Sequence, residues 1–129
     1  MHDLMEAARE ARQLAYVPYS NFAVGAAVLT TDGKIFTGCN IENASYGLCI
    51  CAERTAIFKA VSAGCMKFTA LAVIADTKQP TAPCGACRQV MIEFSIPKII
   101  MSNIVGEVIE SSMADLLPYA FTECDIEKG

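Results

Sequence analysis

The chain has 129 residues and a mass of 13.8 kDa, a length that predicts a single domain spanning residues 1–129. Its net charge of −4 argues against a protein that follows a nucleic-acid backbone, since such proteins need a basic surface. Hydrophobic residues make up 53% of the chain, too many for a disordered protein and enough to indicate that some apolar surface is buried between subunits.

Neither a membrane span nor a secretion signal is predicted. The longest uninterrupted apolar run covers residues 22–29, whereas a spanning helix needs about 20 apolar residues. Acidic residues occur near the N-terminus, where a signal peptide would carry basic and apolar ones. We therefore expect a cytoplasmic protein, whose seven cysteines are reduced thiols or metal ligands.

Hydrophobic spacing and turn residues predict alternating helices and strands in the first half of the chain. The expected elements are a helix over 2–15, a strand over 22–30, a hairpin turn at Asp32-Gly33, a return strand over 34–40, an irregular segment over 41–50 and a helix over 51–63.

The second half continues the alternation. The expected elements are a central strand over 68–75, a loop over 76–83, a helix over 84–94, short strands over 98–101 and 105–109, and a short helix over 113–117. Helices that follow buried strands require a mixed sheet with helices on both faces. The predicted fold is a three-layer α/β/α arrangement around a mixed sheet of about five strands.

Three cysteines lie at the predicted starts of two helices. Cys51 begins one helix, and Cys84 and Cys87 lie at the start of another. A helix N-terminus favours the thiolate, which is the form of cysteine that binds metal. The spacing of Cys84 and Cys87 lets two sulfurs reach one ion, and Cys51 would be a third ligand. Zinc with three protein ligands keeps a fourth position for water, as in catalytic sites.

Charged residues beside these cysteines extend the prediction. Glu53 follows Cys51 by two residues, so its carboxylate would lie near the ion without binding it and could carry protons. Arg54 and Arg88 directly follow the ligand-bearing segments. We expect each guanidinium to donate to a ligand sulfur and to offset the negative charge of three thiolates.

Other interpretations of the cysteines remain open at this point. Two cysteines three residues apart at a helix start also occur in redox sites, although that interpretation gives Cys51 and Glu53 no role. A structural zinc site would need a fourth ligand, and Cys49 could supply it or replace Cys51. Otherwise Cys49, like the remaining cysteines Cys39, Cys65 and Cys124, is interpreted as a small hydrophobic residue or an incidental thiol.

The run Cys51-Ala52-Glu53, followed by Pro83-Cys84-Gly85-Ala86-Cys87, resembles the signature of zinc-dependent cytidine deaminases. Segments 18–27, 38–46 and 116–121 extend the resemblance over nearly the whole chain. Because the first ligand is a cysteine, the chain resembles the small homotetrameric branch of the family. The resemblance implies one Zn²⁺ per chain and a hydrolase that converts cytidine and 2′-deoxycytidine to uridine and 2′-deoxyuridine plus ammonia, in pyrimidine salvage.

The resemblance also implies which residues bind the substrate. Asn40 and Glu42 would hold the ribose, chiefly its 3′-hydroxyl, and their spacing on an extended segment points both side chains to one side. Phe22 would pack against the pyrimidine ring, and the backbone N–H of Ala52 would bind its O2 atom.

Contributions from neighbouring subunits are implied as well. Ala44, Tyr46 and Phe121 would complete the sites of a homotetramer across subunit interfaces. The partner is expected to be a small nucleoside, with no nucleic-acid polymer and no membrane. The alternative function is a deaminase of a modified cytosine nucleoside, such as a nucleoside antibiotic.

Overall fold

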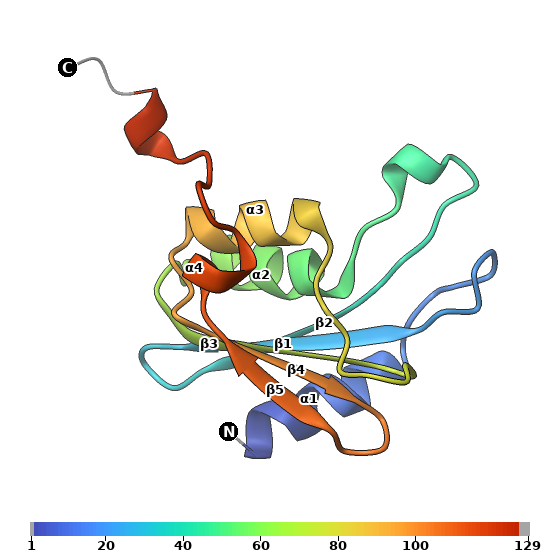
Figure 1. The fold of residues 1–129 in the computed structure, drawn as a ribbon. Helices are drawn as coiled ribbons and strands as arrows, with labels where there is room; N and C mark the ends of the chain where they lie inside the picture. Colours follow the sequence, from blue (N-terminus) through green and yellow to red (C-terminus); the bar gives the residue numbers. More distant parts are fainter. Residues whose placement is uncertain (1, 127–129) are drawn as a thin grey trace.

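A five-stranded sheet forms the centre of the computed structural model, which describes residues 2–126 (Figure 1). Its strands are β1 (Val24–Thr30), β2 (Ile35–Cys39), β3 (Phe68–Ala75), β4 (Lys98–Asn103) and β5 (Val108–Ser111), in the order β2-β1-β3-β4-β5. Strands β3 and β4 are parallel and the other neighbours are antiparallel, so the predicted mixed sheet is confirmed.

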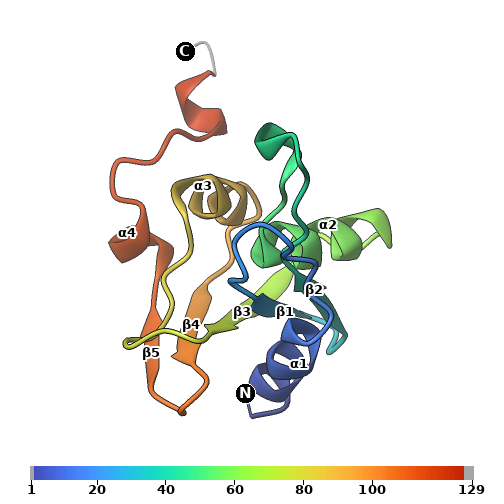
Figure 2. The same cartoon turned by 90° about the vertical axis from the view of Figure 1, so that its right-hand side faces the viewer.

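Helices cover both faces of this sheet. Helix α1 (His2–Arg12) lies on one face, and α2 (Ala52–Ser62) and α3 (Gly85–Glu93) lie side by side on the other (Figures 1 and 2). The remaining helical segments are short: η1 (Tyr46–Leu48), α4 (Met113–Leu116) and η2 (Glu123–Asp125). This is the predicted three-layer α/β/α fold. No helix within residues 2–126 has the length and apolar character needed to cross a membrane.

The core follows the apolar pattern of the strands. Seven of the eight residues of β3 are buried, as expected for a central strand covered on both faces. One core cluster, with Leu71 and Met91, lies between the sheet and the helix pair α2 and α3. A second cluster, with Leu4 and Ile74, lies between the sheet and α1.

Some predicted boundaries differ from the structure. The first helix ends at Arg12 and does not reach residue 15. The last strand begins at Val108 because residues 103–107 form the turn that precedes it. In this turn the N–H of Gly106 donates to the carbonyl of Asn103, and Gly106 has a φ of 100°, which favours glycine.

Close contact between β2 and α2 fixes the start of that helix. A Cβ atom at Gly38 would lie 2.4 Å from the backbone nitrogen of Ala56 and 2.5 Å from the carbonyl oxygen of Ala52. Only glycine therefore allows α2 to lie this close to the strand. Since Ala52 begins α2, the contact also positions Cys51 and Glu53.

Candidate active site

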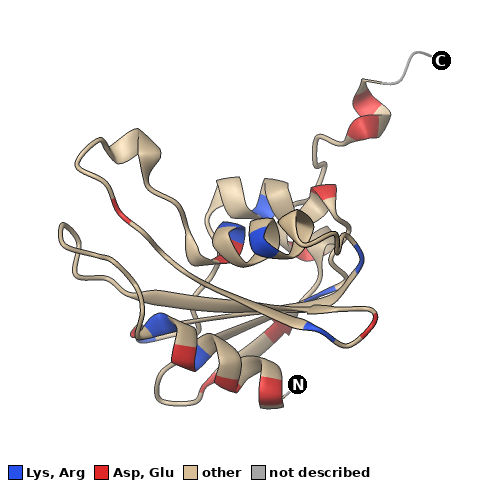
Figure 3. Cartoon of the chain, turned by 180° about the vertical axis from the view of Figure 1, so that it is seen from behind, with Lys and Arg blue, Asp and Glu red and all other residues tan. Residues whose placement is uncertain are grey.

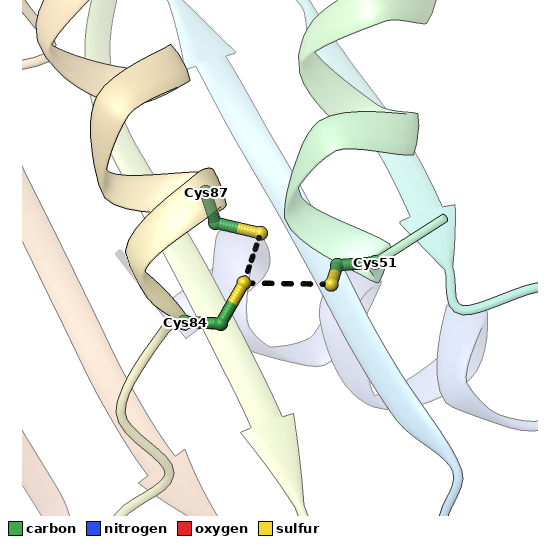
Figure 4. A group of neighbouring side chains, drawn as sticks. All are labelled: Cys51, Cys84 and Cys87. Atoms are coloured by element: carbon green, nitrogen blue, oxygen red, sulfur yellow. Dashed lines mark hydrogen bonds between the residues drawn. The ribbon is translucent and has the colours of Figure 1, made fainter. Parts of the chain in front are cut away.

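Three sulfur atoms meet between the N-termini of α2 and α3 (Figure 4). The Sγ atoms of Cys51 and Cys84 lie 3.6 Å apart, and those of Cys84 and Cys87 lie 3.5 Å apart. Cys51 and Cys84 are the N-cap residues of the two helices, and neither side chain makes a capping hydrogen bond. Their sulfurs are therefore available to bind a metal ion.

This cluster fits zinc. Four ligands placed tetrahedrally about 2.3 Å from zinc have sulfur–sulfur distances of about 3.8 Å, close to the two spacings observed. Within residues 2–126, no other group of three His, Cys, Asp or Glu side chains meets so closely. Cys49 lies outside the cluster, and its Sγ accepts a hydrogen bond from the N–H of Asn43 at 3.3 Å. The donor set is thus three cysteine sulfurs.

The surroundings of Cys51 favour its thiolate. Hydrogen bonding from Cys87 is the main cause that lowers the pKa of Cys51 to about 5, and Arg54 and Cys84 add to it. The Nη2 atom of Arg54 donates to Sγ of Cys51 at 3.3 Å. The pKa of Cys87 is raised, mainly because its thiol is hydrogen-bonded to Cys51 and also because it is buried. A cluster that already stabilises one thiolate is prepared for a cation.

The two arginines have different partners. Arg54 contacts a ligand sulfur, as expected, and its buried Nε atom has no hydrogen-bond partner within the described residues. The expectation for Arg88 is wrong. Its Nε donates to the carbonyl of Pro83 and its Nη1 to the carbonyl of Leu116, both at 2.8 Å. The guanidinium of Arg88 lies between two backbone segments and joins the loop before α3 to the end of α4.

Glu53 lies in the first turn of α2 and is only 4% exposed. Burial raises the pKa of its carboxyl to about 7. Neighbouring charges also act on it: Cys51 raises the pKa further and Arg54 lowers it. A carboxyl with a pKa near neutrality can both accept and give a proton at physiological pH. No other acidic side chain of the described residues is buried.

A cavity of about 410 Å³ opens beside these groups, within the size range of small-molecule sites. Most of the predicted site residues line it: Phe22, Asn40, Glu42, Tyr46, Cys51, Ala52, Glu53, Arg54 and Cys84. They come from four separate parts of the chain that the fold brings together. The cavity wall also contains Thr81 and Ala82, from the loop that leads to Cys84.

Asn40 is anchored to the strand next to it. Its Oδ1 accepts from the N–H of Val24 at 2.8 Å, and its Nδ2 donates to the carbonyl of Phe22 at 2.7 Å. A primary amide has two N–H donors and two acceptor positions. One donor of Asn40 therefore remains free beside the cavity.

Glu42 holds the loop after α1. Its Oε1 accepts from the N–H groups of Tyr19 and Ser20 at 3.0 and 3.1 Å, and its Oε2 accepts from the hydroxyl of Ser20. The Ser20 hydroxyl is also the main cause that lowers the pKa of Glu42. Sequence reasoning missed Ser20 as a site residue, because a serine beside a proline-containing turn has an ordinary local explanation.

Two of the residues expected to act across subunit interfaces, Ala44 and Phe121, do not line the cavity of their own chain, and the third, Tyr46, lines it only with a largely exposed side chain. Ala44 and Tyr46 lie on the segment that extends away from the sheet, and Tyr46 is 73% exposed (Figure 1). Phe121 lies on the C-terminal segment, and its side chain is 61% exposed. The backbone carbonyl of Phe121 accepts a hydrogen bond from Nε2 of Gln89 at 2.7 Å.

A zinc-compatible set of three thiols, a buried carboxyl and a small-molecule cavity on an α/β/α fold define a metal-dependent hydrolytic enzyme. The model of the cytidine and deoxycytidylate deaminase zinc-binding region matches residues 1–103. The chain belongs to this family of zinc-dependent deaminases.

Individual relatives agree with this assignment. A cytidine deaminase of Sporosarcina psychrophila is 54% identical over 126 residues, covering 95% of this chain and 92% of the relative. The solved structure of cytidine deaminase from Burkholderia pseudomallei is 59% identical and superposes with a TM-score of 0.90, covering 93% of this chain and 98% of that one. A blasticidin-S deaminase of Bacillus cereus is only 26% identical. The similarity thus favours a cytidine deaminase over an enzyme for an antibiotic nucleoside.

Proposed function

We propose that the chain catalyses the hydrolytic deamination of cytidine and 2′-deoxycytidine, as a step in pyrimidine salvage. The observation that carries this proposal is the buried carboxyl of Glu53, which opens into the cavity beside three clustered cysteine sulfurs. The reaction consumes one water and releases one ammonia, with uridine or 2′-deoxyuridine as the other product.

Cys51, Cys84 and Cys87 would hold one zinc ion per chain. When bound, zinc supplies the Lewis acidity that makes water a nucleophile at neutral pH. Arg54 would offset part of the negative charge of the sulfurs through its hydrogen bond to Cys51. No such role is proposed for Arg88, because its guanidinium donates hydrogen bonds to two backbone carbonyls.

Glu53 would carry the protons. Its carboxylate takes a proton from the attacking water and delivers it to N3 of the pyrimidine, while the water oxygen bonds to C4. The same carboxylate then takes the proton of the new C4 hydroxyl and passes it to the 4-amino group, so that the C4=O bond forms, the C4–N bond breaks and ammonia leaves. Burial excludes competing water from this carboxyl, and the pKa near 7 suits a group that acts first as base and then as acid.

The free hydrogen-bonding positions of Asn40 and Glu42 support a sugar hydroxyl as their ligand. Glu42 uses three of its roughly four lone-pair positions within the chain, which leaves one acceptor on Oε2. Asn40 has one free donor. A hydroxyl that donates to Glu42 and accepts from Asn40 would satisfy both, and the ribose 3′-hydroxyl is the proposed group.

The base would lie deeper in the cavity. Phe22 is partly exposed at the cavity wall, where its ring can pack against a pyrimidine. Ala52 is the first residue of α2, so its backbone N–H has no partner inside the helix and could bind the pyrimidine O2.

A homotetramer with shared sites is proposed as the active form, each subunit being one domain over residues 1–129. Large exposed apolar side chains on the projecting segments support it, among them Tyr46, Leu48 and Phe121. In such an assembly Ala44, Tyr46 and Phe121 would reach the cavity of a neighbouring subunit. The cytoplasm is the proposed location, because none of the seven cysteines forms a disulfide, as expected in a reducing compartment.

A polynucleotide substrate is a poor fit for the charge distribution. Seen from behind, a few basic residues gather on the helix pair α2 and α3 and the others lie apart from them, while acidic residues lie on α1 and η2 (Figure 3). A channel for single-stranded nucleic acid needs a continuous basic groove.

A substrate panel tests the proposed function. Purified protein would be incubated separately with cytidine, 2′-deoxycytidine, cytosine, cytidine 5′-monophosphate and blasticidin S, and the loss of absorbance on deamination would be followed. We expect rapid turnover of both nucleosides and slow turnover of the others. Preference for the free base or for the antibiotic would contradict the proposal.

A further inference from the structure

We propose that Ser20 is a positioning residue for sugar recognition, because its hydroxyl bridges Glu42 and Phe22 and sets which part of the Glu42 carboxylate remains free. The inference rests on the proposed deamination of cytidine nucleosides at this site. Ser20 touches neither the sulfur cluster nor Glu53 among the described hydrogen bonds, so its effect would pass through Glu42.

The bridge is made by one oxygen atom. The hydroxyl of Ser20 donates to Oε2 of Glu42 and accepts from the N–H of Phe22 at 3.0 Å. A hydroxyl has a single donor, and here the carboxylate takes it. The side chain proposed to hold the sugar and the residue proposed to pack against the base are therefore connected through Ser20.

The two oxygens of Glu42 are held differently. Oε1 accepts from two backbone N–H groups, which a change of side chain at position 20 leaves in place. Oε2 is held within the chain by the Ser20 hydroxyl and carries the remaining free lone pair. Without that hydroxyl, the carboxylate keeps its anchor at Oε1 but loses the contact that holds Oε2 in place at the cavity wall.

The Ser20 hydroxyl also stabilises an unusual backbone conformation at Asn21, the residue between Ser20 and Phe22. Asn21 has a φ of 57°, in the left-handed region that non-glycine residues rarely adopt. The bond from the N–H of Phe22 to the Ser20 hydroxyl closes the turn around Asn21, and the N–H of Asn21 donates to the carbonyl of Val17 at 3.0 Å. The Ser20 hydroxyl thus stabilises a turn that carries Phe22 into the cavity wall.

The test compares Ser20→Ala with wild-type protein on two substrates, cytidine and 3′-deoxycytidine. We expect the wild-type preference for cytidine, measured as the ratio of kcat/KM values, to fall about 2- to 10-fold in Ser20→Ala, the effect of losing one ordinary hydrogen bond. The change should lie in KM, with kcat nearly unchanged. Ser20→Thr keeps the hydroxyl and should restore the ratio.

Controls separate this role from a general loss of structure. Ser62→Ala removes an exposed serine hydroxyl at the end of α2 and should leave both substrates unaffected. An unchanged ratio in Ser20→Ala, or an equal loss for both substrates, would overturn the inference. If the wild-type protein fails to deaminate cytidine, the proposed function is wrong. NMR titration with uridine and 3′-deoxyuridine then measures, without turnover, the ratio of the two dissociation constants in wild-type protein and in Ser20→Ala.

Discussion

The Nη2 atom of Arg54 lies 3.3 Å from the sulfur of Cys51, three residues earlier in the chain. Both residues belong to the start of α2, so the fold delivers a metal ligand and the cation that offsets its charge on one rigid element. Hydrogen bonds from arginine to a thiolate withdraw charge from the sulfur, which leaves a bound metal ion more electrophilic.

Replacement of Arg54 tests this relationship. Arg54→Ala should retain zinc and lower kcat/KM for cytidine by about 10–100-fold, the usual cost of removing a hydrogen bond to a metal ligand. Arg54→Gln, which keeps a donor, should lose less. The matched control is Arg88→Ala, which removes bonds to two backbone carbonyls and should lower Tm more than Arg54→Ala does. Full activity in Arg54→Ala would show that the guanidinium has no influence on the metal site.

Zinc binding is predicted to need all three clustered sulfurs. Each of Cys51→Ala, Cys84→Ala and Cys87→Ala should lose zinc, measured by elemental analysis, and should lower Tm because metal binding is coupled to folding. Removing the metal from wild-type protein with a chelator should lower Tm as well. Cys49→Ala is the control, since its sulfur bonds to Asn43 outside the cluster. Loss of zinc in Cys49→Ala, with zinc retained in Cys51→Ala, would contradict the ligand assignment.

Much of this site could be predicted because its chemistry is local in sequence. Cys84 and Cys87 lie within one turn at the start of α3, and Glu53 follows Cys51 by two residues at the start of α2, so local spacing alone groups the residues of each helix start. The buried run of β3 likewise predicts a central strand without tertiary information.

The partners of Arg88 and Ser20 could not be predicted from the sequence, because both contacts join residues far apart in the chain. The guanidinium of Arg88 binds the carbonyl of Leu116, 28 residues away, and the hydroxyl of Ser20 binds Glu42, 22 residues away. Each pairing depends on where separate elements meet in the fold, and no local pattern encodes that. Proximity of Arg88 to Cys87 in sequence suggested a sulfur contact, but the helix directs the side chain toward Pro83.

The contact between β2 and α2 is predicted to tolerate only glycine at position 38. Gly38→Ala places a Cβ atom 2.4 Å from the backbone nitrogen of Ala56, so the helix must shift, and overpacking of this kind costs about 1–3 kcal/mol. Chemical denaturation should show this loss of stability, and kcat should fall because Glu53 moves with α2. Gly47→Ala is the control, as no atom lies within 4 Å of its added Cβ. Equal stability of the two variants would contradict the close packing.

The shared-site proposal predicts a tetramer in solution. Light scattering should give a mass of four times 13.8 kDa. Phe121→Ala should lower activity without affecting zinc, because its ring would act in a neighbouring subunit. Mixed tetramers reassembled from inactive Glu53→Ala chains and Phe121→Ala chains should regain turnover. A fully active monomer would rule out the shared site and leave the zinc chemistry unaffected.

Glu53 provides the most direct test of the central claim, that a buried carboxyl beside a three-cysteine zinc site deaminates cytidine. The measurement is zinc content and kcat for cytidine in Glu53→Gln, which preserves the shape of the side chain and removes its ability to take a proton. We predict wild-type zinc content with kcat reduced by about 10²–10⁴-fold or more, since the residue acts at more than one proton transfer. A variant that retains zinc and turns over cytidine at the wild-type rate would contradict the account.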